Sequence, residues 1–556
     1  MKLTGILIIG TGLLTVQNVR AQKVNEKDSV LNRTIVVENQ YNPEVMDAFK
    51  INVLPEVAEP AVTKYEIDYA TSPHAFGSWK YQPMKAMLRE QRQTAAPRGY
   101  ARAAYGNMGN IDLKGSYLWD ISKNDRLGVM VSMYGRNGDL PDFSTDKSDW
   151  KSRFYRTDAS LDYRHGFRNV SLSLGGSFAS QVFNYMPSME TSPSYTAGND
   201  RQHYTLGEGY VGVTSVQGRL PVDFAVQTGF RRFDRKYEIP FLGSGAENAV
   251  HTTGYLAGAV NETQQVGIGF DMDNLFYASS LMMKDFTLVQ LNPYYTLKTE
   301  EVSLRVGAHV DLQTANGSGV KWAPDVKLGY TFASSYTLFL QATGGTRLND
   351  FRQLNGFSPY GMQYGQLKTS YTPLDARIGL KASPVTGFGF KIEGGYRITK
   401  DELFASPSLP EDCSLVYSPI LQEKAKVAFG TLTFDYSYQD WIDLSLAGSY
   451  YSWNVDDGVE PLLWLKPQVA VDFGARAKIA DPLHVTLDYR YEGRKDITGI
   501  GKADPVNNLC VGAEYELFKR LNVFARLNNL LNRNYLTESG YPTQGFYVMA
   551  GLGCRF

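Results

Sequence analysis

The chain has 556 residues, a formal net charge of −1 and a mean hydropathy of −0.29. The near-neutral charge argues against a nucleic-acid-binding protein, and the three cysteines, Cys413, Cys510 and Cys554, form neither a disulfide framework nor a metal-ligand spacing. These bulk values do not exclude a transmembrane barrel, because lipid-facing residues alternate there with polar ones. The 36 tyrosines and 28 phenylalanines suit aromatic girdles at membrane interfaces, and the 52 glycines suit bent strands.

The N-terminal residues are typical of a secretory signal. Lys2 is followed by an apolar run from Leu3 to Val16, and Ala21 precedes Gln22 at a site suited to cleavage. We therefore expect residues 1–21 to be a signal peptide. A membrane-anchoring helix is disfavoured because the run is shorter than the ~20 residues that a span needs.

Residues 22–97 show weak alternation and are punctuated by prolines from Pro43 to Pro97. We expect an extended N-terminal segment in the periplasm or partly inside a barrel lumen.

From residue 98 onward, apolar and polar residues alternate with a period of two, and turn residues separate the runs. The predicted strands cover 98–106, 110–119, 126–136, 153–165, 168–181, 203–216, 218–232, 252–262, 264–277, 286–298, 301–313, 319–331, 335–344, 373–383, 386–398, 422–437, 440–453, 462–478, 482–494, 505–517, 520–528 and 544–556.

The two faces of each predicted strand differ in chemistry. In 301–313, residues such as Val306 and Leu312 fall on one face, while Arg305, His309 and Asp311 fall on the other. Charged residues, which would be costly against hydrocarbon, are thus confined to one face of the strand. This indicates an apolar face toward lipid and a polar face toward a lumen.

The connections alternate between short and long. Joints such as 121–125, 298–300 and 480–482 are tight, whereas 137–152, 182–202, 233–251, 345–372 and 399–421 are long. We predict an all-β protein: a transmembrane antiparallel β-barrel of about 22 strands spanning 98–556, with short periplasmic turns, long extracellular loops and both ends in the periplasm. Its expected location is the outer membrane of a Gram-negative cell, in contact with outer-membrane lipid.

The end of the chain resembles the last hairpin of the TonB-dependent outer-membrane receptors. The run Val523 to Tyr535 (VFARLNNLLNRNY) is similar to a motif that precedes the final strand in that family, and the strand ends in an aromatic residue, Phe556. The resemblance implies that Phe556 is a C-terminal assembly signal read by the barrel-assembly machinery. The sequence style resembles that of Bacteroidetes proteins.

A second segment is similar to the TonB box of this family, an extended stretch that pairs with the energy-transducing protein TonB by strand addition. It comprises Thr34, Ile35, Val36, Val37 and Glu38. The alternative is that this run is only a strand of the N-terminal region.

The chain also departs from the family, whose members carry a larger N-terminal plug domain, and plugged lumens are the rule for 22-stranded transporters. The segment 22–97 is too short for a complete plug. In place of a complete plug, a wide barrel must be filled by this segment, by in-folded loops, or by a periplasmic or surface partner protein.

Neither a catalytic site nor a cofactor site is expected. The six histidines have no partners at metal-ligand spacing, and no nucleophile, base and carboxylate set stands out. His309, near Arg305 and Asp311, fits a polar lining network better than a catalytic base. The charges of the inward faces are expected to pair across neighbouring strands; they include Arg156, Asp158, Asp162, Arg164, Lys391, Glu393 and Arg397.

The long predicted loop 345–372 carries aromatic residues among polar ones: Phe351, Phe357, Tyr360 and Tyr364. Such residues suit a ligand or partner surface. The simpler alternative is that they pack the loops together over the mouth of the barrel.

Three functions fit these features. The first is transport of a nutrient across the outer membrane by a TonB-dependent-receptor-like barrel, together with a partner protein. The second is a structural or assembly scaffold that no longer transports, and the third is a passive porin. No feature indicates an enzyme.

Overall fold

The computed structural model describes residues 97–140, 149–188, 193–194, 199–239, 245–278, 283–315, 319–363, 365–409 and 411–556. Most of them lie in β-strands, and the helical elements among them are α1 (Phe351–Phe357) and the short 3-10 helix η1 (Glu460–Leu463). No helix in this part of the chain is both long and apolar enough to span a bilayer.

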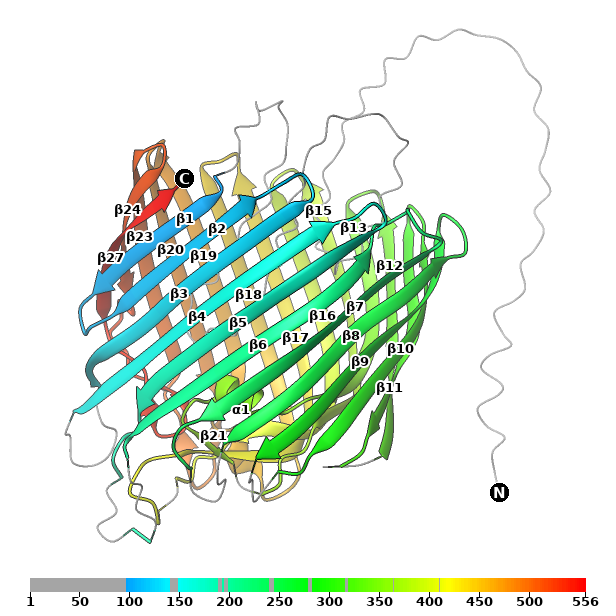
Figure 1. Cartoon of the computed structure of the whole chain (residues 1–556). Helices are drawn as coiled ribbons and strands as arrows, with labels where there is room; N and C mark the ends of the chain where they lie inside the picture. Colours follow the sequence, from blue (N-terminus) through cyan, green and yellow to red (C-terminus); the bar gives the residue numbers. More distant parts are fainter. Residues whose placement is uncertain are drawn as a thin grey trace, which may run out of the picture. The chain divides into compact units, whose positions relative to one another are not determined.

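Twenty-two antiparallel strands close into a barrel (Figure 1). Closure is made by β1, which pairs with β2 on one side and with β27 on the other, where Tyr100 lies opposite Arg555. The barrel strands are β1 (Gly99–Gly106), β2 (Ile111–Asp120), β3 (Asp125–Leu140), β4 (Trp150–Gly166), β5 (Val170–Asn184), β6 (Arg201–Ser215), β7 (Val222–Arg235), β8 (Ala246–Ala259), β9 (Gln264–Ala278), β10 (Phe286–Lys298), β11 (Val302–Gln313), β12 (Gly319–Phe332), β13 (Tyr336–Arg347), β15 (Ser370–Val385), β16 (Phe388–Ala405), β17 (Ser418–Tyr438), β18 (Ile442–Val455), β19 (Pro467–Ala480), β20 (Leu483–Arg494), β23 (Val506–Phe518), β24 (Leu521–Asn528) and β27 (Tyr547–Arg555).

The predicted segments match these strands one to one, which confirms the predicted fold class. The observed strands are often longer at the long-loop end: β3 continues to Leu140, and β17 begins at Ser418. Above the hydrocarbon layer the outward residues need not be apolar, so the sequence alternation fades before the strand ends. The segment predicted as 462–478 began too early, because Leu462 and Leu463 belong to η1.

The two faces of the barrel are as predicted. Val306 and Leu312 on β11 are exposed, whereas Asp311 is buried on the inward face. The outward apolar residues recur around the whole barrel and form a surface suited to lipid: Val129, Leu161, Phe178, Val226, Leu256, Val266, Val306, Leu328, Leu340, Ile378, Ile392, Leu446 and Leu552. Exposed aromatic rings mark the short-turn end, as expected of an interfacial girdle: Trp119, Phe167, Tyr438, Trp441, Phe518 and Phe556.

The two ends of the barrel differ in their connections. At one end tight turns such as 386–387 and 519–520 join the strands, and the first and last strands meet there through hydrogen bonds of 2.6 and 2.9 Å between the backbones of Gly99 and Phe556. The other end carries the long loops, so it is the extracellular side.

Five short strands lie in these loops: β14 (Gly361–Gln363), β21 (Asp496–Ile497), β22 (Gly501–Lys502), β25 (Leu536–Glu538) and β26 (Tyr541–Pro542). β14 pairs in parallel with the start of β17, with Met362 opposite Pro419. This pairing holds the loop between β13 and β15 against β17, two strands beyond β15 along the rim.

Two pairs of inward charges lie within one strand and not across neighbouring strands as predicted. Arg156 bonds Asp158 at 2.9 Å and Lys391 bonds Glu393 at 2.7 Å, each within one strand. Residues i and i+2 share a face and lie about 7 Å apart, within reach of a long cation. The residues directly opposite Lys391 are Lys381 and Thr433, and neither is an acid.

Cross-strand pairs occur elsewhere, as between Arg305 and Asp325 at 2.6 Å. Of the other charges predicted to pair, Asp162 instead accepts a hydrogen bond from Tyr210, two strands away.

Candidate functional site

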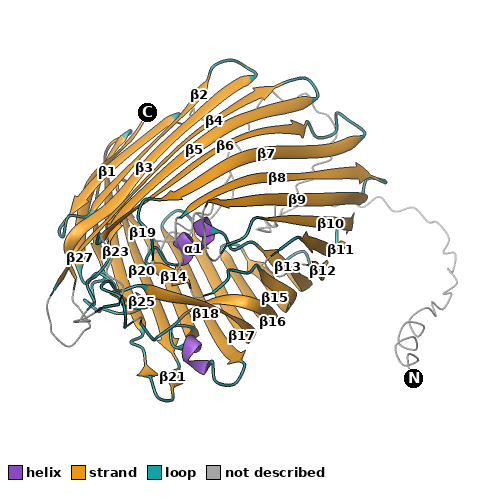
Figure 2. Ribbon diagram, turned by 60° about the horizontal axis from the view of Figure 1, so that its bottom comes forward, coloured by secondary structure: helices purple, strands orange, loops and turns teal. Residues whose placement is uncertain are grey.

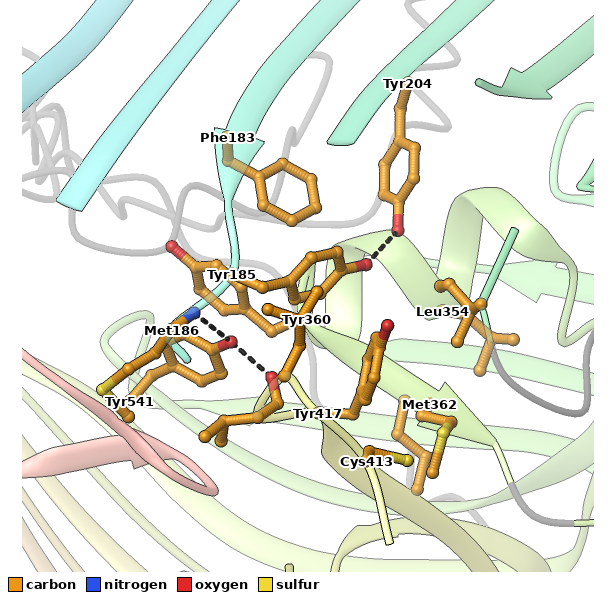
Figure 3. Packing of buried hydrophobic residues seen from close by; sticks show 14 of the residues in the cluster. Phe183, Tyr185, Met186, Tyr204, Leu354, Tyr360, Met362, Cys413, Tyr417 and Tyr541 are labelled. Carbon is orange, nitrogen blue, oxygen red and sulfur yellow. Dashed lines mark hydrogen bonds between the residues drawn. The ribbon is translucent and has the colours of Figure 1, made fainter. Parts of the chain in front are cut away.

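Four extracellular loops meet over the mouth of the barrel and share one hydrophobic core (Figures 2 and 3). They are 185–200, 348–369, 406–417 and 529–546, and one residue from each of two further loops, Ile239 and Met283, joins the same core. We call this core, together with the strand ends that it contacts, the mouth cluster. Its buried members are Leu140, Trp150, Phe183, Tyr185, Met186, Tyr204, Phe233, Ile239, Met283, Phe351, Leu354, Tyr360, Met362, Leu367, Leu403, Cys413, Leu415, Val416, Tyr417, Ile420 and Tyr541.

One tyrosine links three of the four loops by hydrogen bonds and contacts the fourth by ring stacking. The Tyr541 hydroxyl donates to the carbonyl oxygen of Val416 at 2.6 Å and accepts from the backbone N–H of Met186 at 3.3 Å (Figure 3). Its ring stacks on that of Tyr360, with the ring centroids 3.7 Å apart. The loops are therefore held by directional contacts as well as by apolar burial.

Helix α1 is pinned to the barrel wall by a buried ionic group. Asp350 caps the helix, accepting from the backbone N–H of Gln353 at 2.7 Å, and its other oxygen lies 2.5 Å from the Arg231 guanidinium on β7. Glu247 on β8 accepts from the backbone N–H of Phe351 at 2.9 Å. The Arg231 side chain is 5% exposed and both carboxylates are 0% exposed.

Two carboxylates thus share a single cation at this anchor. The second oxygen of Glu247 is 3.7 Å from Arg231 and has no hydrogen-bond partner within the described chain. A buried charge without its partner is strongly destabilising. The attachment of α1 to the wall therefore depends on Arg231.

A second acid lies at the contact between the loop 348–369 and the hairpin of β25 and β26. The Ser358 hydroxyl donates to the Glu538 carboxylate. Burial raises the pKa of Glu538 to about 7, against the lowering effects of Ser358 and Arg136. Burial likewise raises the pKa of Tyr360 to about 12. Glu538 is therefore a loop carboxyl that changes charge near neutral pH.

The structure places the aromatic residues of the predicted loop in or beside the mouth cluster. Phe351 and Tyr360 are 2% and 3% exposed, and the partly buried Phe357 packs against the mouth cluster. Tyr364 lies outside the described residues. The rings that the structure describes have the positions of loop-packing residues.

The other residues singled out in the sequence are dispersed. The TonB-box-like run Thr34 to Glu38, the predicted signal peptide and residues 22–96 lie outside the described part of the chain. The Phe556 side chain is 50% exposed at the short-turn end, where its ring stacks near Tyr117 with centroids 6.0 Å apart.

His309 lies in a polar network on the inward face, as predicted. Its ring is 3.3 Å from the amide of Asn292, whose oxygen in turn accepts from Arg305 at 2.6 Å. Within the described ranges, no group of three or more His, Cys, Asp or Glu side chains could hold a metal ion.

Sequence reasoning missed the anchor residues Arg231, Glu247 and Asp350. A usable signal existed for one of them, because Asp350 followed three residues later by Gln353 is a helix-start pattern. No pattern links Arg231 to Asp350, which is 119 residues away in the chain.

No family model and no curated protein sequence matches the chain. Solved structures do. The FrpB iron transporter of Neisseria meningitidis (F3-3 variant) matches with a TM-score of 0.64 and 11% identity, over 84% of this chain and 82% of that one. A mutant of the ferric enterobactin receptor PfeA of Pseudomonas aeruginosa, in complex with enterobactin, gives 0.62 and 12%, over 83% and 82%. The copper transporter OprC gives 0.59 and 13%, over 83% and 80%.

Identities of this size establish a shared fold, and the cargo of those proteins is not transferred with it. The neighbours are transporters and receptors rather than enzymes. The closed barrel with its apolar outward band is an outer-membrane structure. The chain is therefore an outer-membrane protein with the 22-stranded β-barrel fold of the TonB-dependent receptors.

Proposed function

We propose that this barrel takes up a nutrient across the outer membrane, through a mouth that its own loops cover at rest, and that it works with a partner protein. The fold supports a receptor-like role, since its structural neighbours are transporters and receptors. The observation that carries the proposal is the mouth cluster, in which several extracellular loops share one buried core.

This cluster favours gated uptake over passive diffusion. A porin needs a mouth that stays open, whereas here Tyr541 and Arg231 tie the loops to one another and to the wall. Cargo entry then requires the loops to separate, and a cargo that binds the separated state better would shift the equilibrium toward it. Such gating is the mechanism that we propose.

The partner is proposed from the N-terminal segment. The run Thr34 to Glu38 is similar to a TonB box, and an extended apolar segment of this kind can add as a strand to a partner's sheet. A periplasmic energy-transducing protein of the TonB type is the partner that this run would bind.

Single-channel conductance in a planar bilayer tests the proposal, using the purified chain with and without residues 22–97. Gated uptake predicts low conductance at rest in the full chain, with rare openings that become more frequent when the mouth cluster is weakened by Tyr541→Ala. Large, steady conductance in both forms would indicate a passive porin. No conductance in any form, the variant included, would indicate a sealed scaffold.

A further inference from the structure

Beneath the mouth cluster, the inward face of the barrel carries a recess of about 510 Å³. It extends along the wall from β8 to β16, and its charged or titratable lining residues are Asp271, His309, Arg347, Asp375 and Arg397. The same wall leads directly into the covering loop, because Arg347 ends β13 and the loop 348–369 follows it.

A β-bulge builds the centre of this recess. The pairing of β13 with β15 shifts register between Thr343 and Gly345, and Gly345 has φ +128°, a conformation that favours glycine. The next residue, Thr346, is held by its backbone: its N–H donates to Asp311 at 2.6 Å and its carbonyl accepts from Gln290 at 2.8 Å. Bulges of this kind re-aim side chains next to binding sites.

At the bulge, a buried polar atom that lines the recess has no hydrogen-bond partner among the described residues. The Thr346 side-chain hydroxyl has no hydrogen-bond partner among the described residues, although Thr346 is only 7% exposed. Buried hydroxyl groups normally have a partner, so this one is available to a ligand.

The charges at the two ends of the recess are poorly compensated. At the β9 end, the Asp271 carboxylate is 48% exposed and lies 3.9 Å from His251, which bonds Asp273 more closely at 2.8 Å. At the β16 end, the Arg397 guanidinium has no ion pair or hydrogen bond with any described residue. Arg347, 54% exposed, has only long contacts of 3.4 Å, one to the Glu402 carboxylate and one to the Ser370 hydroxyl.

The Asp375 carboxylate, which lies between the two ends of the recess, already has hydrogen-bond partners. Asp375 accepts two hydrogen bonds from Arg377, at 2.9 and 2.8 Å. The recess therefore presents an acidic end at Asp271 and a basic end at Arg347 and Arg397, with neutral polar groups such as Asn292 and Thr346 between them.

We infer that this recess binds a zwitterionic solute, with the solute's cationic end at Asp271 and its anionic end at Arg397 and Arg347. This inference rests on the proposed function, because it names the chemical class of the cargo. Six strand-to-strand steps of about 4.8 Å separate β9 from β16, or roughly 29 Å along the curved wall. An extended peptide of about eight residues at ~3.3 Å each matches that length.

The test uses an octapeptide of alternating glycine and serine with free ends, titrated into the full chain in detergent by isothermal calorimetry. We expect the free peptide to bind at least about fivefold more tightly than its N-acetylated or C-amidated forms, and the doubly capped peptide to bind most weakly. Asp271→Asn should abolish the preference for the free amino end. Arg397→Gln should reduce the preference for the free carboxylate, since Arg347 remains.

Matched controls are Asp488→Asn on β20 and Arg476→Gln on β19, two inward charges outside the recess. They should leave both preferences unchanged. Equal binding of the free and doubly capped peptides, no binding of either, or equal losses in the controls would overturn the inference. Peptide binding needs no transport, so its failure with gated conductance intact refutes only this inference. Steady porin-like conductance with binding intact would refute only the proposed gating.

Discussion

The anchor of α1 gives the sharpest single perturbation, Arg231→Met. Methionine replaces the aliphatic stem of Arg231 with an unbranched apolar side chain. It removes the guanidinium, which lies 2.5 Å from Asp350 and 3.7 Å from Glu247. Two carboxylates with fully buried side chains then face each other without a cation. Removing one partner of a buried ion pair typically costs 3–5 kcal/mol.

The lower end of that range sets the expected effect. Separating the loop from the wall returns Asp350 to water, so most of the penalty falls on the closed state. A shift of about 3 kcal/mol raises the open population roughly 150-fold. The amides of α1 report this opening, because Leu354 donates its N–H to the carbonyl of Asp350 and exchanges with solvent only when the helix opens.

Hydrogen exchange of residues 351–357 in the full chain measures the effect. The control is Arg232→Met at the adjacent, exposed position, which should leave exchange unchanged. Adding Asp350→Asn to Arg231→Met should restore much of the protection, because asparagine still caps a helix and removes one buried charge. Equal exchange in Arg231→Met and Arg232→Met would refute the view that this ion group holds the loop.

Three further perturbations test other parts of the structure. The pKa of Glu538 is about 7 in the folded loops, whereas an ordinary glutamate has a pKa of 4.5. Between pH 4.5 and 7 the closed loops therefore bind more protons than the opened loops. The stability of the closed loops should fall as pH rises from about 5 to 7 and then level off. Exchange of the Ser358 amide against pH checks this, and Glu538→Gln should flatten the profile. Tyr541→Phe leaves the Val416 carbonyl and the Met186 N–H without their partner, at a cost of about 1–2 kcal/mol of loop stability. Hydrogen exchange of the Met186 amide should therefore become faster. Unchanged exchange of this amide would count against the role of Tyr541 in linking three loops. Phe556→Ala should lower the amount of folded barrel in the outer membrane if the terminal ring is an assembly signal, whereas Phe518→Ala, which removes another exposed ring at the same end, should not; quantitative blotting of membrane fractions separates the two.

The barrel could be predicted from sequence because the alternation that specifies each strand lies within that strand. Each strand must alternate, since Val306 meets lipid while Arg305 and Asp311 meet polar surroundings, and a slip of one residue would exchange the two faces. The period of two therefore gives the strand number and the inward residues without any knowledge of contacts. It loses force at the long-loop end, where β3 and β17 rise beyond the apolar band.

The covered mouth could not be predicted in the same way. The loops have no period, and their contacts join residues such as Met186 and Tyr541 that are 355 positions apart in the chain. Aromatic content did indicate that 345–372 either packs or binds, but composition alone does not say which. The recess was equally hidden, because its shape depends on the bulge at Gly345 rather than on residue type.

The central claim, that the loops cover the outer mouth, can be measured with a cysteine already in the chain. Cys413 is a free thiol in the mouth cluster with 1% exposure, and Figure 3 shows it beside Met362. Burial also raises its pKa, which lowers its reactivity further. With Cys510 and Cys554 replaced, a charged, membrane-impermeant maleimide added to intact cells should label Cys413 at least about 100-fold more slowly than in urea-unfolded protein, the ratio that an opening free energy of about 3 kcal/mol gives. Labelling of the native protein as fast as that of the unfolded protein would contradict a covered mouth.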